Sequence, residues 1–192
     1  MNIFNTTMRY LKERQTPFVR ILHLATIALI LNQIIVSNFI AFNDSGEIST
    51  NTLEYYATWI HIITGFFLIP IFVTFLIIEL RQQSLKYFFP YLFGEFAQLS
   101  SDIRQLSKLK LPDLSDYGVA ASIQGLGLGA VFLVLFSGLL WFITWNANIS
   151  WSHDVEEIHK SLTVLVQAYV IGHGVMGVLH IFAYSKSLNR GK

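Results

Sequence analysis

The chain has 192 residues, of which 53% are hydrophobic and only 13% are charged. A soluble domain is normally about a quarter charged, so this composition indicates a membrane protein surrounded by lipid. The formal net charge of +1 gives no reason to expect a nucleic acid as partner. The absence of cysteine excludes disulfides, iron–sulfur clusters, thiolate-ligated haem and covalently attached c-type haem.

Four apolar runs are each long enough to cross the roughly 30 Å of hydrocarbon in a bilayer. They cover residues 18–42, 56–80, 119–145 and 158–184. The sequence therefore predicts an all-α membrane protein, with a single domain over residues 1–192 built as a four-helix transmembrane bundle. Pro70 is expected to kink the second span. The polar and basic residues before the first span do not resemble a cleaved signal peptide, so we expect them to be retained.

Basic residues gather in alternate segments between the spans. The first and third connections, about residues 43–55 and 146–157, are acidic, and Lys160 is the only basic residue on their side. The basic residues of the other segments are Arg9, Lys12, Arg14, Arg20, Arg81, Lys86, Arg104, Lys108, Lys110, Lys186, Arg190 and Lys192. By the positive-inside rule, both termini and the second connection are predicted to be cytoplasmic.

The second connection, about residues 81–118, is unusually long. Its apolar residues recur at spacings of four and three, which is one face of a helix: Leu92, Phe96, Leu99, Ile103 and Leu106. Arg104, Lys108 and Lys110 lie toward the C-terminal end, and Pro112 is expected to end the helix. The pattern predicts an amphipathic helix on the cytoplasmic membrane surface; packing over the ends of the spans is the alternative, and both can hold.

Four histidines lie in the apolar runs or near their ends, where an imidazole is costly and usually marks a function. His159 and His173 are fourteen residues apart, which spans roughly 21 Å of helix and returns to within about 40° of the same face. By depth, His61 pairs with His159 on the outer side, and His23 pairs with His173 on the cytoplasmic side. Neutral imidazole at both axial positions is a normal b-type ligation, so the sequence predicts two stacked, non-covalent haems.

Other roles for the histidines stay open. His180 lies seven residues past His173 and about 20° away around the helix, so it could replace His173, or face a propionate or a quinone. His153 is expected to be solvated in the outer loop, and a packing role remains the alternative for each histidine. A zinc or di-iron site fits less well, because the ligands divide between two depths and Glu79 is the only carboxylate well associated with a span.

Glycines accompany the third and fourth runs. Gly125 and Gly129 form a small-xxx-small pair that allows helices to approach closely. Gly172, Gly174 and Gly177 flank His173 and would leave room for a porphyrin, although plain helix packing is the alternative.

Together, Arg20-x-x-His23, His61-x-x-x-Gly65 and the His159–His173 spacing resemble the bacterial four-helix di-haem cytochromes b. These include stand-alone cytochrome b561 and the gamma subunits of respiratory formate dehydrogenases and hydrogenases. The resemblance covers all four runs and implies two haem b groups, electron exchange with quinone, and a place in the bacterial cytoplasmic (inner) membrane. His180 also recurs in cytochrome b561-like chains, where it is not a ligand, which favours His173. Arg20 could neutralise a propionate of the cytoplasmic-side haem or act as a positive-inside anchor.

In the gamma subunits, the quinone site lies near the end of the long second connection. This chain has Asp116-Tyr117-Gly118 there, without the asparagine–glycine–glutamine arrangement of the formate dehydrogenase version. We also do not expect it to have the long C-terminal tail of that version. Tyr117, Ser122 and Gln124 are candidates for hydrogen bonds to quinone.

Three functions follow as hypotheses. The first is an electron-transfer subunit of a respiratory complex, joining the quinone pool to an outer-side dehydrogenase or a cytochrome c partner. The second is a stand-alone, quinone-linked oxidoreductase of the cytochrome b561 type. The third is a haem-free four-helix membrane protein that uses its histidines for proton transfer or packing.

Overall fold

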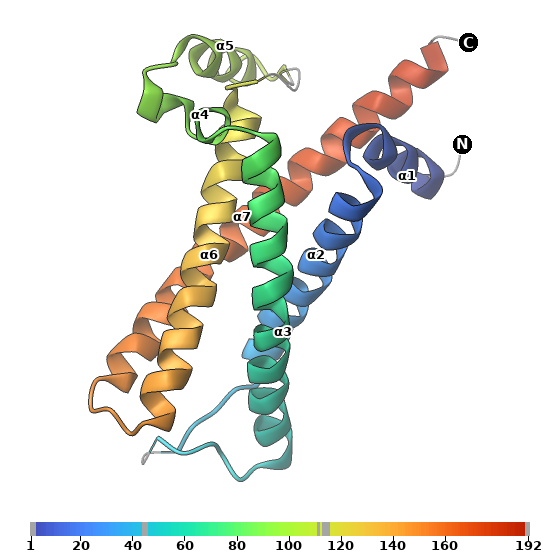
Figure 1. Cartoon of the computed structure of the whole chain (residues 1–192). Helices are drawn as coiled ribbons and strands as arrows, with labels where there is room; N and C mark the ends of the chain where they lie inside the picture. Colours follow the sequence, from blue (N-terminus) through green and yellow to red (C-terminus); the bar gives the residue numbers. More distant parts are fainter. Residues whose placement is uncertain (1–2, 44–45, 111, 113–115, 191–192) are drawn as a thin grey trace. The chain divides into compact units, whose positions relative to one another are not determined.

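The computed structural model describes residues 3–43, 46–110, 112 and 116–190 (Figure 1). Of the residues that the structure describes, 81% are helical, and their only β feature is an isolated bridge between Phe42 and Ile48. This confirms the predicted all-α class. Lys192 and Asp44, which belong to the charge pattern, lie outside the described residues.

Four helices are long and apolar enough to cross a membrane: α2 (Pro17–Ser37), α3 (Thr52–Gln82), α6 (Val119–Asn146) and α7 (Ser152–Arg190). Each coincides with one of the predicted runs. The helix α3 continues through Pro70, because a membrane helix tolerates the lost N–H donor; the kink itself stays a prediction.

The fourth helix begins earlier than expected. Because α7 begins at Ser152, the predicted acidic connection over 146–157 is reduced to residues 147–151. Asp154 lies in the first turn of α7, where a carboxylate interacts favourably with the N-terminal end of the helix dipole. The acidic residues thus stabilise the start of α7 at a position where the sequence indicated a loop. As a consequence, His159 lies in the second turn of α7 and not in the first, as predicted.

A further helix, α1 (Ile3–Arg14), precedes the first span and was not predicted. It is separated from α2 by Gln15 and Thr16. Thr16 is the N-cap of α2, where its Oγ1 accepts a hydrogen bond from the backbone N–H of Val19 at 3.4 Å. Pro17 follows at the first helical position, which suits its fixed φ and its missing N–H.

The prediction of one amphipathic helix in the second connection is wrong in extent. The segment contains α4 (Leu85–Phe88), the 3-10 helix η1 (Pro90–Phe93) and α5 (Ala97–Leu106). Gly94 separates η1 from α5 with a φ of +76°, a conformation that glycine adopts without strain. The helix α5 ends at Leu106, well before Pro112, and Leu109 has a positive φ.

The chain divides into two compact units, Met1–Ile77 and Ile78–Lys192. In the second unit, α6 and α7 are joined by residues 147–151 and pack side by side (Figure 1), and α4 and α5 contact α6. Within this unit, the two glycines of the predicted Gly125–Gly129 pair have different surroundings. A Cβ at Gly125 would lie 2.7 Å from the Cβ of Phe88 in α4, whereas nothing lies within 4 Å of a Cβ at Gly129.

Candidate functional site

His159 lies on α7 with its ring half-buried against α6. Its Nδ1 lies 3.1 Å from the carbonyl oxygen of Val134 and 3.0 Å from Oγ of Ser137. A carbonyl oxygen only accepts hydrogen bonds, so this contact requires the proton to be on Nδ1. In the neutral ring, the lone pair is then on Nε2, which is the arrangement that a metal-ligating histidine needs.

Gly138 allows the His159 ring to approach α6. A Cβ at this position would lie 2.9 Å from Cε1 and 3.3 Å from Nδ1 of His159. Ser137 Oγ also donates to the Val134 carbonyl at 3.0 Å, so one turn of α6 supplies both polar partners and the space for the ring. Sequence reasoning missed this turn, although a serine beside a glycine in an apolar span is a signal for helix packing.

His173 is held through its neighbour Tyr169, one helical turn earlier. The two rings are stacked, with centroids 5.1 Å apart and planes 27° apart. The Tyr169 ring occupies the space beside Gly127 of α6, where a Cβ would overlap it. Within the second unit, no atom of another segment lies within 4 Å of a Cβ added at Gly172, Gly174 or Gly177.

In the first unit, His23 contacts two side chains. Its ring stacks on Phe75 of α3 with centroids 5.7 Å apart and planes 7° apart. Its Nδ1 lies 3.1 Å from Nε2 of Gln15, and Gln15 Oε1 is buried without a hydrogen-bond partner in the described chain. A half-turn of the Gln15 amide would bring its oxygen Oε1 to His23 Nδ1. Because an amide oxygen only accepts, His23 would then carry its proton on Nδ1 and its lone pair on Nε2.

Thr26 lies one turn after His23 on α2. Its Oγ1 is likewise buried, with no hydrogen-bond partner among the residues that the structure describes. Buried polar atoms without partners are rare in folded proteins. The Thr26 hydroxyl, one turn from His23, is thus left able to bind a further polar group.

His61 lies on α3 beside a polar network that the sequence analysis did not identify. Its backbone carbonyl accepts a hydrogen bond from Nε2 of Gln33 at 3.0 Å. Gln33 Nε2 also lies 2.6 Å from Oγ1 of Thr64, which accepts a hydrogen bond from Nδ2 of Asn32 at 3.0 Å. These contacts join α2 to α3 at the level of His61, and polar side chains inside an apolar span were the signal for them.

Arg20 lies in the first turn of α2 and is half-buried. Within the described residues, its guanidinium forms no ion pair and no side-chain hydrogen bond. An arginine in this state is suited to a carboxylate, which it binds in bidentate geometry. In the described part of the chain, no group of three or more histidine, aspartate or glutamate side chains is arranged so that it could hold a metal ion.

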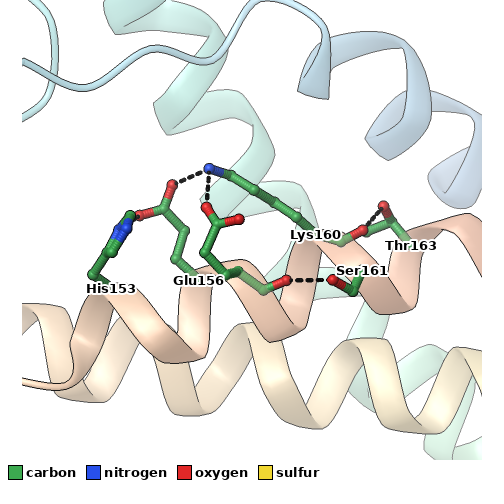
Figure 2. Close-up of polar contacts among 6 residues, drawn as sticks. His153, Glu156, Lys160, Ser161 and Thr163 are labelled. Carbon is green, nitrogen blue, oxygen red and sulfur yellow. Dashed lines mark hydrogen bonds and ion pairs between the residues drawn. The ribbon is translucent and has the colours of Figure 1, made fainter.

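The first turns of α7 carry a charged cluster (Figure 2). Lys160 Nζ lies 2.8 Å from a Glu156 carboxylate oxygen and 2.9 Å from one of Glu157. His153 is in the first turn of the helix, not in a loop as expected, but its side chain is 76% exposed, which confirms the expected solvation. Two carboxylates thus balance Lys160, the one basic residue that departs from the charge pattern at this end.

The three candidates for quinone binding have different surroundings. Ser122 is buried, and its Oγ donates to the Gly118 carbonyl at 3.1 Å. Tyr117 has a φ of +65°, and its ring centroid lies 5.5 Å from Nζ of Lys86. A hydrogen bond from Lys86 to Glu95 at 2.7 Å raises the pKa of Lys86, so this lysine stays charged beside Tyr117. Gln124 is half-buried on α6.

Comparisons with known proteins give one match. A family model described as prokaryotic cytochrome b561 matches residues 14–190, which include the four spans and all six histidines. Searches of curated proteins and of solved structures gave no match.

Proposed function

The chain belongs to the prokaryotic cytochrome b561 family, and we propose that it is a di-haem member that transfers electrons between the quinone pool and a redox partner. Family membership and the four apolar helices together make the chain a bacterial multi-pass membrane protein. Membership also makes it a b-type cytochrome of electron transfer, which binds haem b. The proposal adds two haems, their ligands, quinone as substrate, and a role as the membrane subunit of a respiratory complex.

His159 carries the proposal, because its Nδ1 is bound by α6 and its Nε2 is left to bind iron. His61 is the proposed second ligand of this haem, and His23 and His173 are the proposed ligands of the other. Haem b, when bound, supplies a one-electron iron couple. The protein groups that act on the ligands are the Val134 carbonyl and the Gln15 amide, since a hydrogen bond at Nδ1 fixes the ring orientation and makes Nε2 more basic.

Arg20 is the proposed partner of a haem propionate on the cytoplasmic side. Arg20 is half-buried as a residue and forms no ion pair in the described chain, and it lies three residues before His23. For quinone, we propose Tyr117 and Gln124 as hydrogen-bonding groups. Ser122 is restricted to accepting, because its hydroxyl proton is given to the Gly118 carbonyl.

The proposed topology places both termini and the 83–118 connection in the cytoplasm, across the bacterial inner membrane. The distribution of lysine and arginine supports it. The pairing of Lys160 with Glu156 and Glu157 adds to the difference in charge between the two proposed sides. Lys160 is the single basic residue on the proposed outer side, and two carboxylates compensate its positive charge.

The first experiment is to measure haem per chain, with a reduced-minus-oxidised spectrum, in the purified protein. We expect two b haems, and one after replacement of any of the four histidines by alanine. His153→Ala is the matched control, because His153 is exposed on the same helix as His159, and His180→Ala is expected to retain both haems. A colourless wild-type protein from haem-replete cells would reject the proposal in favour of a haem-free role.

The partner is tested separately by purification from the native membrane in a mild detergent. Co-purification of an outer-side dehydrogenase or a cytochrome c is expected for a respiratory subunit. An isolated chain that reduces quinone with a small donor would instead identify a stand-alone oxidoreductase.

A further inference from the structure

The connection between α3 and α6 begins and ends at one membrane surface. The helix α3 ends at Gln82 and α6 begins at Val119, and no described residue between them lies in a helix able to span a bilayer. The short helices η1 and α5 are therefore tied at both ends to the same surface, where the lipid headgroups lie.

A buried carboxylate fixes how α5 lies on α6. Asp102 is only 2% exposed, and its Oδ2 accepts a hydrogen bond from the backbone N–H of Val119 at 2.9 Å. Its Oδ1 accepts a second hydrogen bond from Nε2 of Gln98 at 2.7 Å. Asp102 thus satisfies the first N–H of α6, whose own N-cap, Gly118, makes no side-chain hydrogen bond, and it turns a polar side of α5 toward the protein.

Because the polar side faces inward, several apolar side chains of this segment remain exposed. Ile103, directly after Asp102, is 57% exposed. Phe96, Phe93 and Leu92 are exposed to a similar or greater extent, while Leu99 and Leu106 are half-buried. Exposed apolar side chains gathered in one segment mark an interaction surface.

Charge identifies the partner. Arg104, Lys108 and Lys110 follow the apolar residues, are exposed, and form no ion pair in the described chain, whereas Lys86 in the same connection is paired with Glu95. Apolar residues next to unpaired basic residues are the pattern of a segment that lies in a bilayer interface rich in anionic lipid.

We propose that η1 and α5 form an interfacial anchor: Leu92, Phe93, Phe96 and Ile103 enter the bilayer interface, and the three basic residues bind anionic headgroups. Asp102 holds the anchor in this orientation through the first N–H of α6.

The absence of cysteine allows a direct test with single-cysteine spin labels on the full chain in vesicles that contain phosphatidylglycerol. Labels at Phe96→Cys and Ile103→Cys are expected to be accessible to oxygen and shielded from a water-soluble nickel chelate. Ser101→Cys, an exposed polar position of α5, is the matched control and is expected to be accessible to the chelate. Leu126→Cys, exposed on the apolar helix α6, reports that the protein is correctly inserted.

With insertion verified at Leu126, accessibility of position 103 to the chelate would overturn the proposal, because it would place α5 in water. Shielding of position 103 from both reagents would also overturn it, in favour of burial against protein. In vesicles without anionic lipid, or after replacement of Lys108 and Lys110 by glutamate, we expect a several-fold fall in the oxygen-to-nickel accessibility ratio at position 103. An unchanged ratio would reject the role of the basic residues.

Discussion

The Nδ1 atom of His159 lies 3.1 Å from the carbonyl oxygen of Val134, on the neighbouring helix. His23 also has a partner at Nδ1, but that partner is the side chain of Gln15. Two of the four proposed ligands therefore have a polar partner at Nδ1, which leaves Nε2 as the nitrogen proposed to bind iron. The partner of His159 is a backbone carbonyl, which no substitution removes. The partner of His23 is a side-chain amide, which a substitution can change.

Gly138→Ala is expected to weaken haem binding at the His159 site. The new Cβ would lie 2.9 Å from Cε1 of His159, so the ring would have to shift and would lose its alignment with Val134. Changes around a metal-ligating histidine typically cost about 10- to 100-fold in affinity. Haem titration of the protein checks this. Gly129→Ala, where nothing lies within 4 Å, is the control, and equal affinities in the two variants would contradict the role of Gly138.

Gln15→Glu is expected to lower the midpoint potential of one haem by some tens of millivolts. A carboxylate at Nδ1 of His23 makes the imidazole more electron-donating, which favours ferric over ferrous iron. Redox titration followed by optical spectra measures the two potentials. Gln83→Glu, an exposed position outside the spans, makes the same change of charge. If both variants shift the potentials alike, the effect is one of general charge and not of the His23 contact.

Gly127→Ala is expected to destabilise the packing of α6 against α7 by about 1–3 kcal/mol, the usual cost of forcing extra volume into a packed contact. The added Cβ would overlap the Tyr169 ring, which stacks on His173. Thermal unfolding in detergent measures the loss. The double variant Gly127→Ala/Tyr169→Ala removes the overlap, so its loss of stability should be smaller than the sum of the losses in the two single variants. A loss equal to that sum would argue against direct contact between the two residues.

Asp102→Ala is expected to cost about 1 kcal/mol, the typical value for a lost N-cap interaction, and to release α5 from α6. Hydrogen exchange of the Val119 amide and proteolysis of the 83–118 connection should both accelerate. Asp116→Ala is the control, because Asp116 is an exposed acidic residue just before α6. Unchanged exchange at Val119 in the Asp102 variant would show that another group binds this N–H.

Some features were predictable because they depend on local sequence. A helix that crosses hydrocarbon must be apolar over about 20 residues, and the fourteen-residue spacing of His159 and His173 is preserved wherever α7 begins. The class, the four spans and the family resemblance follow from such patterns, and the match over residues 14–190 confirms the family. The pairing of the histidines by depth and the sidedness of the chain stay predictions.

Other features depended on contacts between residues far apart in the chain. Periodicity indicated one helix from Leu92 to Leu106, but Gly94 interrupts it. The hydrogen bond that the Val119 N–H donates to Asp102 decides which side of α5 faces the protein. Likewise, the sequence shows that His159 lies in an apolar helix, but not that Val134 binds its Nδ1. Apolar patterns report how much of a helix avoids water, whereas the partner of each polar atom is decided only when another helix packs beside it.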